Sequence, residues 1–351
     1  MIVVKARFLS QPMTGTQRYG AELSLRLKQI DPSIHFVCPK NVIQHELFEK
    51  LQAEVVGHKT GLLWEQIDLP KYLKAHNNPL LVNYVASAPF GYGNRIVTLH
   101  DITYLRYPKS YSLKFRLQCR LLTPLILKNS LALITVSEFS KKEISGHFRN
   151  YPPPSIHVIY NATGSQFTVK SPNKPSIPYL LAVSSHFYHK NIARLIEAFV
   201  DLHKSGKIDI PLVIAGGSSP YSGNQNFNTV SDSSIRFMGR VSDEELISLY
   251  QSATAFIFPS LYEGFGIPPL EAQACGCPVI ASNAAAIPEV LGDSVLYFNP
   301  DSVSEMQDAI YSIVTDASLR QSLREKGLEN VKRFSWDDSA SRLYDLILKY
   351  S

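Results

Sequence analysis

Residues 258–289 read FPSLYEGFGIPPLEAQACGCPVIASNAAAIPE, and they combine a strand end, a loop and a helix start in succession. The apolar run Ala255–Phe258 predicts a buried strand. A loop carrying Glu263 follows, and the Pro-Pro step at 268–269 predicts a helix with Glu271 in its first turn. This order is typical of the ligand-binding edge of a parallel α/β sheet.

The same window has the chemistry of a sugar-nucleotide site. Gly264 and Gly266 let the backbone approach a ligand closely, and a helix start offers N–H groups and a positive dipole end that suit a diphosphate. Carboxylates at Glu263 and Glu271 can each accept two hydrogen bonds from vicinal hydroxyls. Taken singly, each feature is common at the ends of ordinary helices, where prolines begin a helix and acids complement its dipole. Two acids around a Gly-Phe-Gly loop together favour a ligand site.

Short β-branched runs alternate with amphipathic segments along the whole chain, which predicts an α/β fold with a parallel sheet built more than once. In the first half the predicted strands are Ile2–Leu9, His35–Val37, Leu80–Tyr84, Arg95–Leu99, Ala132–Val136 and His157–Tyr160, and the predicted helices are Thr16–Lys28, Ser112–Asn129 and Ser137–His147. In the second half the predicted strands are Tyr179–Val183, Leu212–Ala215, Ile235–Met238, Ala255–Phe258, Val279–Ala281 and Val295–Phe298, and the predicted helices are Asn191–Lys204, Asp243–Gln251, Pro269–Cys275, Ser302–Ile313, Ser318–Lys332 and Trp336–Lys349.

One segment interrupts this alternation. Residues 164–178 contain a glycine, three prolines and many polar residues, without a helical or strand period, and they predict an interdomain linker. We therefore expect an N-terminal domain over 1–163 and a C-terminal domain over 179–334. The last segment, 335–351, is expected to form a helix that packs back on the N-terminal domain.

Composition sets the class of partner. The net charge of +5 is spread along 351 residues, so it suits anionic nucleotide-sugars or a lipid surface and lacks the concentrated basic stripe of a nucleic-acid binder. The four cysteines lack zinc-site spacing. The start of the chain has no readable signal peptide and no apolar run has the length of a membrane span, which predicts a cytosolic protein.

Several windows together resemble the retaining glycosyltransferases of family 4, which have the GT-B architecture of two Rossmann-like domains with a deep interdomain cleft. The central motif is E-x7-E, here Glu263 to Glu271. The other matching windows are Thr14–Tyr19, His100-Asp101, Thr135–Ser140, Val158–Asn161, Lys190–Ile192, Phe237–Ser242 and Phe334–Trp336. The resemblance covers essentially the full chain.

This resemblance implies roles for individual residues. Glu271 would hold the nucleotide ribose and Glu263 the donor sugar, while Lys190 meets the diphosphate. His100 would lie beside the transferred sugar, which makes Glu263, His100 and Lys190 the expected catalytic residues. The other expected donor contacts are Gly15, Thr16, Arg240, Val241, Gly264, Phe265 and Gly266. Arg18 and Asp101 are expected on the acceptor side.

One position departs from the family pattern. Members usually carry an arginine a few residues before the lysine, where this chain reads Ser184–Lys190, SSHFYHK. Either His186 or His189 supplies partial charge in its place, or Lys190 and the helix start at Pro268 suffice.

The sequence contains no Asp-x-Asp pair to hold a divalent ion, so we expect a metal-independent transferase with no cofactor. The resemblance to mannosyltransferases of polysaccharide assembly makes GDP-mannose the first choice of donor, with UDP-hexoses and dTDP-rhamnose open, and a glycan or lipid-linked saccharide the acceptor. A nucleotide-sugar epimerase and a non-catalytic nucleotide-sugar-binding protein are the competing hypotheses. A Rossmann oxidoreductase is disfavoured because no Gly-x-Gly-x-x-Gly follows the first strand.

Residues 109–128 mix basic and apolar side chains in a helical pattern. Such a helix can lie on an anionic membrane. The commoner explanation is a domain helix whose apolar side is core and whose charges are solvated.

Overall fold

The computed structural model describes residues 1–149, 155–169, 178–185, 187–217 and 232–351. These residues form two units. Unit 1 comprises Met1–Ile102, Gln118–Asn161 and Ser335–Ser351, and unit 2 comprises Thr103–Leu117 and Ala162–Phe334. Part of the predicted linker, 170–177, lies outside the described residues.

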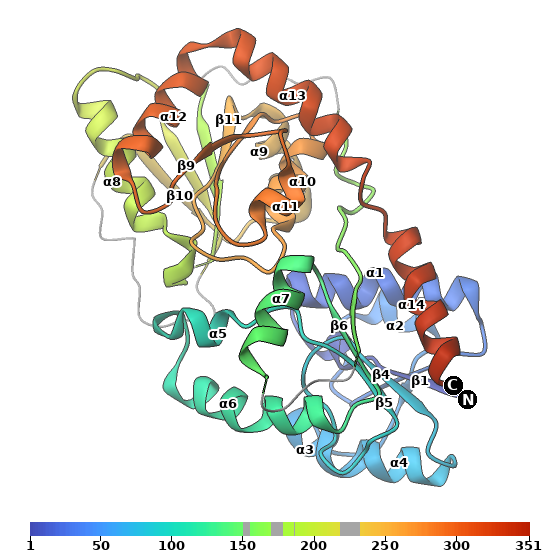
Figure 1. Ribbon diagram of the computed structural model, residues 1–351. Coiled ribbons are helices and arrows are strands. Elements are labelled where there is room, and N and C mark those ends of the chain that lie inside the picture. Colours follow the sequence, from blue (N-terminus) through green and yellow to red (C-terminus); the bar gives the residue numbers. More distant parts are fainter. Residues whose placement is uncertain (150–154, 170–177, 186, 218–231) are drawn as a thin grey trace. The chain divides into compact units, whose positions relative to one another are not determined.

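Unit 1 is built on a parallel sheet of seven strands (Figure 1). Their order is β3-β2-β1-β4-β5-β6-β7, and Val3 of β1 lies between His35 of β2 and Leu81 of β4. The strands are β1 Ile2–Lys5, β2 His35–Cys38, β3 Glu54–Val55, β4 Leu80–Asn83, β5 Arg95–Thr98, β6 Ala132–Thr135 and β7 Ile156–Val158.

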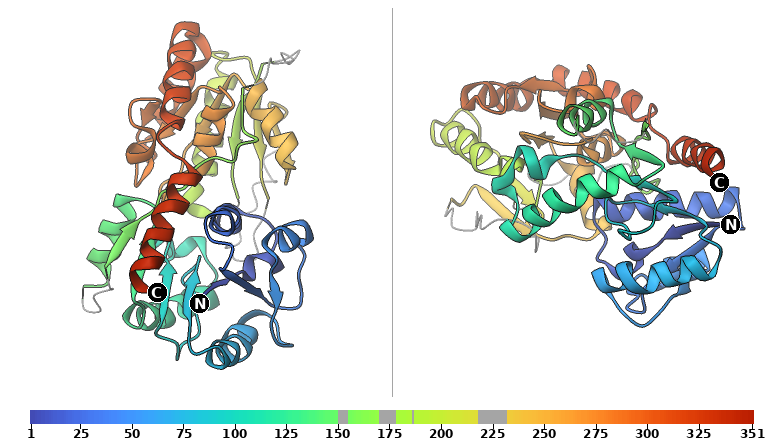
Figure 2. Two further views of the ribbon diagram at one scale, coloured as in Figure 1. Left: turned by 90° about the vertical axis from the view of Figure 1, so that its right-hand side faces the viewer. Right: turned by 60° about the horizontal axis from the view of Figure 1, so that its bottom comes forward.

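Helices cover both faces of this sheet. In Figure 1, α1 and α14 lie on the opposite side of it from α3 and α4, and the chain's two ends lie close together in every view (Figure 2). The helices are α1 Gly15–Ile30, α2 His45–Leu51, α3 Gly61–Leu63, the π-helix η2 Trp64–Asp68, α4 Leu69–Ala75, α7 Glu138–His147 and α14 Trp336–Tyr350, with a 3-10 turn η1 at Arg7–Ser10. Helix α6, Leu113–Lys128, begins in unit 2 and ends in unit 1.

Unit 2 repeats the design with six parallel strands in the order β10-β9-β8-β11-β12-β13. The strands are β8 Leu180–Val183, β9 Leu212–Ala215, β10 Ile235–Gly239, β11 Ala255–Phe258, β12 Val279–Ser282 and β13 Leu296–Phe298. The helices are α5 Thr103–Arg106, α8 Ile192–Lys204, α9 Asp243–Ser252, α10 Ile267–Ala274, α11 Ile287–Leu291, α12 Val303–Thr315 and α13 Ala317–Val331, with 3-10 turns η3 Pro108–Ser110 and η4 Tyr188–Lys190.

Both sheets therefore have the Rossmann order, and the predicted pair of Rossmann-like domains is confirmed. In each sheet the strand order reverses beside the first strand, between β1 and β4 in unit 1 and between β8 and β11 in unit 2. Loops that leave the carboxyl ends of such strands diverge to opposite faces and leave a crevice where ligands bind.

The structure corrects several sequence-based predictions. The predicted strand Ile2–Leu9 ends at Lys5, because Phe8 and Leu9 are buried from the 3-10 turn η1 instead. Helix α10 begins at Ile267, so Glu271 lies one full turn inside the helix and not in its first turn. The elements β3, α2, α4 and α11 were not predicted from the sequence.

The segment Thr103–Leu117 also differs from the predicted domain boundary of 163. It belongs to unit 2 because its side chains contact residues of that unit. The Ser110 hydroxyl forms a hydrogen bond with the His189 ring, and the centre of the Tyr111 ring lies 5.2 Å from that of Phe187. The C-terminal helix α14 belongs to unit 1, where it packs beside α1.

Candidate functional site

The loops after β8 and β11 meet at the switch point of unit 2. The Leu261 amide donates to the His189 carbonyl at 2.7 Å, and the Asn191 side-chain amide donates to the Pro259 carbonyl at 3.1 Å. Asn191 has φ of 60°, a left-handed conformation that asparagine tolerates, and it turns the chain from η4 into α8. These two hydrogen bonds therefore fix the positions from which Lys190 and Glu263 project.

Lys190 and Glu263 form an ion pair across this junction. The Lys190 Nζ lies 2.7 Å from Glu263 Oε1, and the two side chains are 18% and 13% exposed. Lys190 Nζ also lies 6.0 Å from the centre of the Phe258 ring. Both charges keep some contact with water, so either can exchange its partner for a ligand group at less cost than a fully buried pair would require.

The Gly-Phe-Gly loop leads from Glu263 into α10. Gly266 caps the helix with φ of 103°, which side-chain-bearing residues rarely adopt, and Phe265 is anchored edge-on to Phe334 at 5.4 Å. Two of the first four residues of α10 are prolines, so only Ile267 and Leu270 among them have an N–H. An anion at this helix start would therefore meet the dipole and few helix amides.

Glu271 lies deeper in unit 2. It is 7% exposed, and its Oε2 accepts a long hydrogen bond of 3.4 Å from the Tyr250 hydroxyl. Burial, together with the charge of Glu271, raises the pKa of Tyr250 well above its ordinary value, which keeps the phenol protonated as a donor. Glu263 and Glu271 thus come from consecutive elements of one unit, as the E-x7-E spacing predicts.

The two residues predicted to contact the base lie apart from this pair. Arg240 and Val241 follow β10, which is separated from β8 by β9, and the Arg240 side chain is exposed. They share the carboxyl edge of the same parallel sheet with Lys190 and Glu263.

Histidine cannot replace the missing arginine at position 189. His189 is 5% exposed, and burial together with the charge of Lys190 lowers its pKa to about 2, so the ring is neutral. The Ser110 hydroxyl accepts from the His189 amide at 3.1 Å and shares a second hydrogen bond of 2.9 Å with the His189 Nδ1. His186 lies outside the described residues.

Ser110 belongs to a strap, Thr103–Leu117, that holds both loops of this site. Its Tyr107 hydroxyl reaches the Leu261 carbonyl at 3.5 Å, and the Tyr111 ring is nearly parallel to that of His189 at 6.2 Å. Nothing in the sequence placed this strap in unit 2, because its partners lie more than 70 residues away.

Gly216 also shapes this site and was not predicted from the sequence. It follows β9 with φ of 125°, and a Cβ there would lie 1.9 Å from the Ser184 carbonyl oxygen. A glycine directly after a predicted strand was the available signal. Only glycine allows the loops after β8 and β9 to pack this closely.

In unit 1 the predicted residues lie in the first turns of α1 and in the segment that follows β5. Gly15 and Thr16 begin α1, Tyr19 follows one turn later with its ring 4.9 Å from that of His100, and Arg18 lies beside it on the helix. His100 Nε2 donates to the Tyr84 carbonyl at 2.9 Å, since a carbonyl can only accept. Burial lowers the pKa of His100 despite that bond and the neighbouring charge of Asp101.

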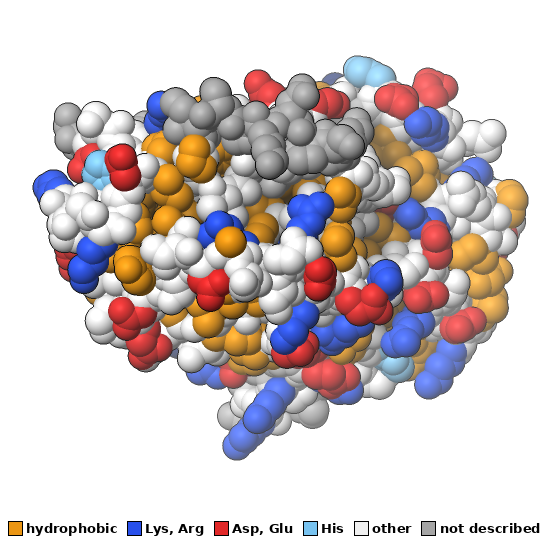
Figure 3. Space-filling view, turned by 90° about the horizontal axis from the view of Figure 1, so that it is seen from above, with side chains coloured by type: hydrophobic (Ala, Val, Ile, Leu, Met, Phe, Trp, Pro, Cys, Tyr) orange, Lys and Arg blue, Asp and Glu red, His pale blue; other side chains and the backbone are white. Residues whose placement is uncertain are grey.

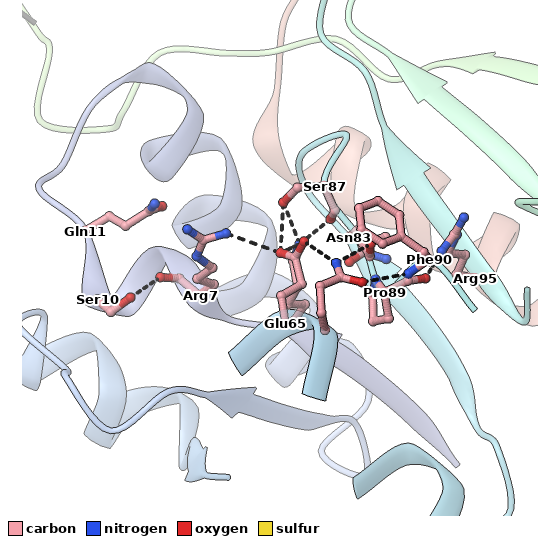
Figure 4. A network of polar contacts seen from close by, with 12 residues as sticks. Arg7, Ser10, Gln11, Glu65, Asn83, Ser87, Pro89, Phe90 and Arg95 are labelled. Carbon is pink, nitrogen blue, oxygen red and sulfur yellow. Dashed lines mark hydrogen bonds and ion pairs between the residues drawn. The ribbon is translucent and has the colours of Figure 1, made fainter. Parts of the chain in front are cut away.

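A buried polar network lies at the switch point of unit 1 (Figure 4). Lys5, the last residue of β1, has its Nζ 2.8 Å from Glu65 Oε2, and both side chains are 1% exposed. Arg7 lies 3.3 Å from the same oxygen, and the Ser87 hydroxyl donates to it at 2.9 Å. Burial alone would raise the pKa of Glu65, but Lys5, Arg7 and Ser87 hold it below its ordinary value. The carboxylate is therefore charged at neutral pH.

Comparison with known proteins adds three findings. The sequence profile described as "Glycosyl transferases group 1" matches residues 166–330. The chain is 32% identical over 267 residues to the O-antigen chain mannosyltransferase B of Escherichia coli, covering 70% of this chain and 68% of that protein. It is 30% identical over 331 residues to the O-antigen chain mannosyltransferase RfbU of Salmonella typhimurium, covering 89% and 90% of the two chains.

A solved structure agrees on the fold. The Anabaena protein HepE in complex with UDP-glucose superposes with a TM-score of 0.74 at 17% identity, over 99% of each chain. At this identity the likeness concerns architecture alone, and it confirms the predicted GT-B fold class of two Rossmann-like domains.

Changing Ser110 to alanine should loosen the turn that carries Lys190. The substitution leaves the buried amide and Nδ1 of His189 without their partner, each at a cost of about 1–3 kcal/mol. Hydrogen exchange read by mass spectrometry should show faster exchange of the peptide containing His189. Ser318→Ala, at an exposed position of α13, should leave that peptide unchanged. Equal protection in both variants would show that Ser110 does not hold the turn.

Changing Glu65 to glutamine should destabilise unit 1 by about 3–5 kcal/mol, because Lys5 stays buried without its counter-charge. The chain's two tryptophans, Trp64 and Trp336, both lie in unit 1, so urea unfolding followed by tryptophan fluorescence reports on that unit. Glu46→Gln, which removes an exposed pair with Lys50, is the control and should change stability by less than about 1 kcal/mol. A similar small loss in both variants would contradict the assigned role of Glu65.

Proposed function

Because this chain belongs to the group 1 glycosyltransferases, we propose that it transfers a hexose, with retention of anomeric configuration, from a nucleotide-sugar to a lipid-linked glycan in cell-surface polysaccharide assembly. Mannose from GDP-mannose is the proposed donor substrate. Two relatives named as O-antigen mannosyltransferases, one aligned over nine-tenths of both chains, support this choice. The observation that carries the catalytic proposal is the Lys190–Glu263 pair at the switch point of unit 2.

In this proposal the donor lies along the carboxyl edge of the unit 2 sheet. Lys190 exchanges Glu263 for the diphosphate, and the freed Glu263 carboxylate accepts hydrogen bonds from sugar hydroxyls. Glu271 takes the ribose hydroxyls from its buried position, and Arg240 and Val241 border the base. The loop amides of Gly264, Phe265 and Gly266 complete the contacts.

Charge on the departing diphosphate is met without a metal ion. Lys190, the loop amides and the dipole of α10 are fixed before the reaction, so they stabilise developing negative charge without reorganising. His189 does not contribute a cation, since it is neutral. The acceptor hydroxyl attacks the face that the diphosphate leaves, and we assign no protein nucleophile.

Unit 1 supplies the remaining groups. Gly15 and Thr16 at the start of α1 face the donor phosphates, neutral His100 borders the transferred sugar, and Arg18 and Asp101 contact the acceptor.

The proposed place of action is the cytoplasm, at the inner face of the membrane where a lipid-linked acceptor is available. Among the helices that the structure describes, none combines the length and apolarity that a membrane span requires. Contact with the membrane is therefore proposed to be peripheral.

The activity is tested by incubating the protein with GDP-mannose, UDP-hexoses or dTDP-rhamnose and a lipid-linked saccharide, and identifying products by mass spectrometry. Mannose transfer from GDP-mannose that persists in EDTA is the expected result. Release of an epimerised nucleotide-sugar without acceptor would identify an epimerase. Donor binding without any product would identify a non-catalytic binding protein. Loss of transfer in EDTA would contradict the metal-free mechanism.

Changing Glu263 to alanine should lower the turnover number for transfer by at least about a hundredfold, because Glu263 is proposed to hold the reacting sugar. The fold should persist, since the side chain is partly exposed and has one ionic partner. The control is Glu244→Gln, at an exposed position of α9. Circular dichroism verifies folding of both variants, and near-normal turnover from folded Glu263→Ala would remove Glu263 from the mechanism.

A further inference from the structure

Helix α6 turns a stripe of leucines to solvent. Leu113, Leu117, Leu121 and Leu125 are 65%, 52%, 68% and 53% exposed. They are spaced four residues apart, which places them along one side of a helix. The side chains that α6 buries, Thr123, Ile126 and Leu127, lie on the other side. The expectation that the apolar side of this helix is core is therefore wrong for its most apolar stripe.

Basic side chains accompany the stripe. Lys114, Arg120 and Lys128 are exposed, and at roughly 100° of rotation per residue they project from the same half of the helix as the leucines. The sequence has no Asp or Glu between Asp101 and Glu138, while it has six Lys and Arg residues there. The face has one sign of charge over its whole length.

This face differs from the surface drawn in Figure 3, where acidic and basic side chains are interspersed. With a net charge of only +5 over the whole chain, such a run without an acid is a local feature. We call the exposed side of α6, Leu113, Lys114, Leu117, Arg120, Leu121, Leu125 and Lys128, the leucine-basic face.

We propose that the leucine-basic face docks on an anionic phospholipid surface. Leucine side chains enter the boundary between headgroups and acyl chains, while the long Lys and Arg side chains reach back to lipid phosphates. A second copy of this chain is a poorer occupant, because a self-complementary contact would bring Lys114, Arg120 and Lys128 against the same cations.

The face gives the proposed transferase a place to meet a lipid-linked acceptor, and the purpose of the docking rests on that proposed function. The binding itself does not, since it requires neither donor nor acceptor. Failure of vesicle binding would leave transfer to a short soluble acceptor intact, whereas failure of the transferase proposal would leave vesicle binding intact.

The test is sedimentation of the full chain with phosphatidylcholine vesicles, with and without phosphatidylglycerol. We expect binding to the anionic vesicles that salt weakens. Leu117→Ser/Leu121→Ser and Arg120→Gln/Lys128→Gln should each weaken binding about tenfold or more. Matched controls are Leu348→Ser, an exposed leucine of α14, and Lys71→Gln/Lys74→Gln on the exposed side of α4; both should bind as the unchanged protein does.

Three results would overturn the proposal. The first is absence of binding, or equal binding to neutral and anionic vesicles. The second is a leucine variant that binds anionic vesicles as tightly as its control. The third is a concentration-dependent dimer in sedimentation equilibrium that Leu117→Ser/Leu121→Ser abolishes, because the stripe would then be covered by a second copy.

Discussion

The contact between the Lys190 ammonium and the Glu263 carboxylate joins the two loops that leave the switch point of unit 2. Two further hydrogen bonds tie the same loops together, one from the Leu261 amide to the His189 carbonyl and one from the Asn191 side-chain amide to the Pro259 carbonyl. Since the loops are already tied, neither side chain must be ordered when a donor arrives. In the proposed reaction this preorganisation is what allows one lysine to meet a diphosphate without help from a second cation.

The buried Lys5–Glu65 ion pair of unit 1 contrasts with the partly exposed Lys190–Glu263 pair of unit 2. Lys5 lies at the carboxyl end of the first strand of its sheet and pairs with Glu65 of the π-helix η2, but here both side chains are 1% exposed. Separating them would leave a buried charge without a partner, so they fix the loops around them and cannot serve an exchanging ligand. The Lys190–Glu263 pair keeps modest solvent contact, and the proposed exchange of Glu263 for a diphosphate depends on this difference from the buried pair of unit 1.

The sequence predicted those parts of the fold and site that depend on local pattern. The apolar run predicted β11 at Ala255–Phe258, and the loop and helix signals after it predicted Glu263 on a loop and Glu271 on the next helix, although not Glu271's depth within that helix. Contacts between distant residues could not be predicted in this way. Lys5 appeared as part of an apolar strand, because its partner Glu65 is 60 residues away on a π-helix that has no periodic signal. Likewise, Ser110 is an ordinary loop serine until His189 is placed beside it.

Such distant contacts also explain why a single linker did not describe the domain organisation. The chain passes between the two units at Ile102, Leu117, Asn161 and Phe334, and so four connections join them. Two of these connections enclose the strap that holds the loops of Lys190 and Glu263, and the crossing at Leu117 lies within α6 itself. Helix α6 contributes Leu113–Leu117 to unit 2 and its remaining residues to unit 1, so the leucine-basic face contains residues of both units. The strap and the leucine-basic face therefore overlap at Leu113, Lys114 and Leu117, so the proposed donor site of unit 2 and the proposed membrane attachment depend on the same connection.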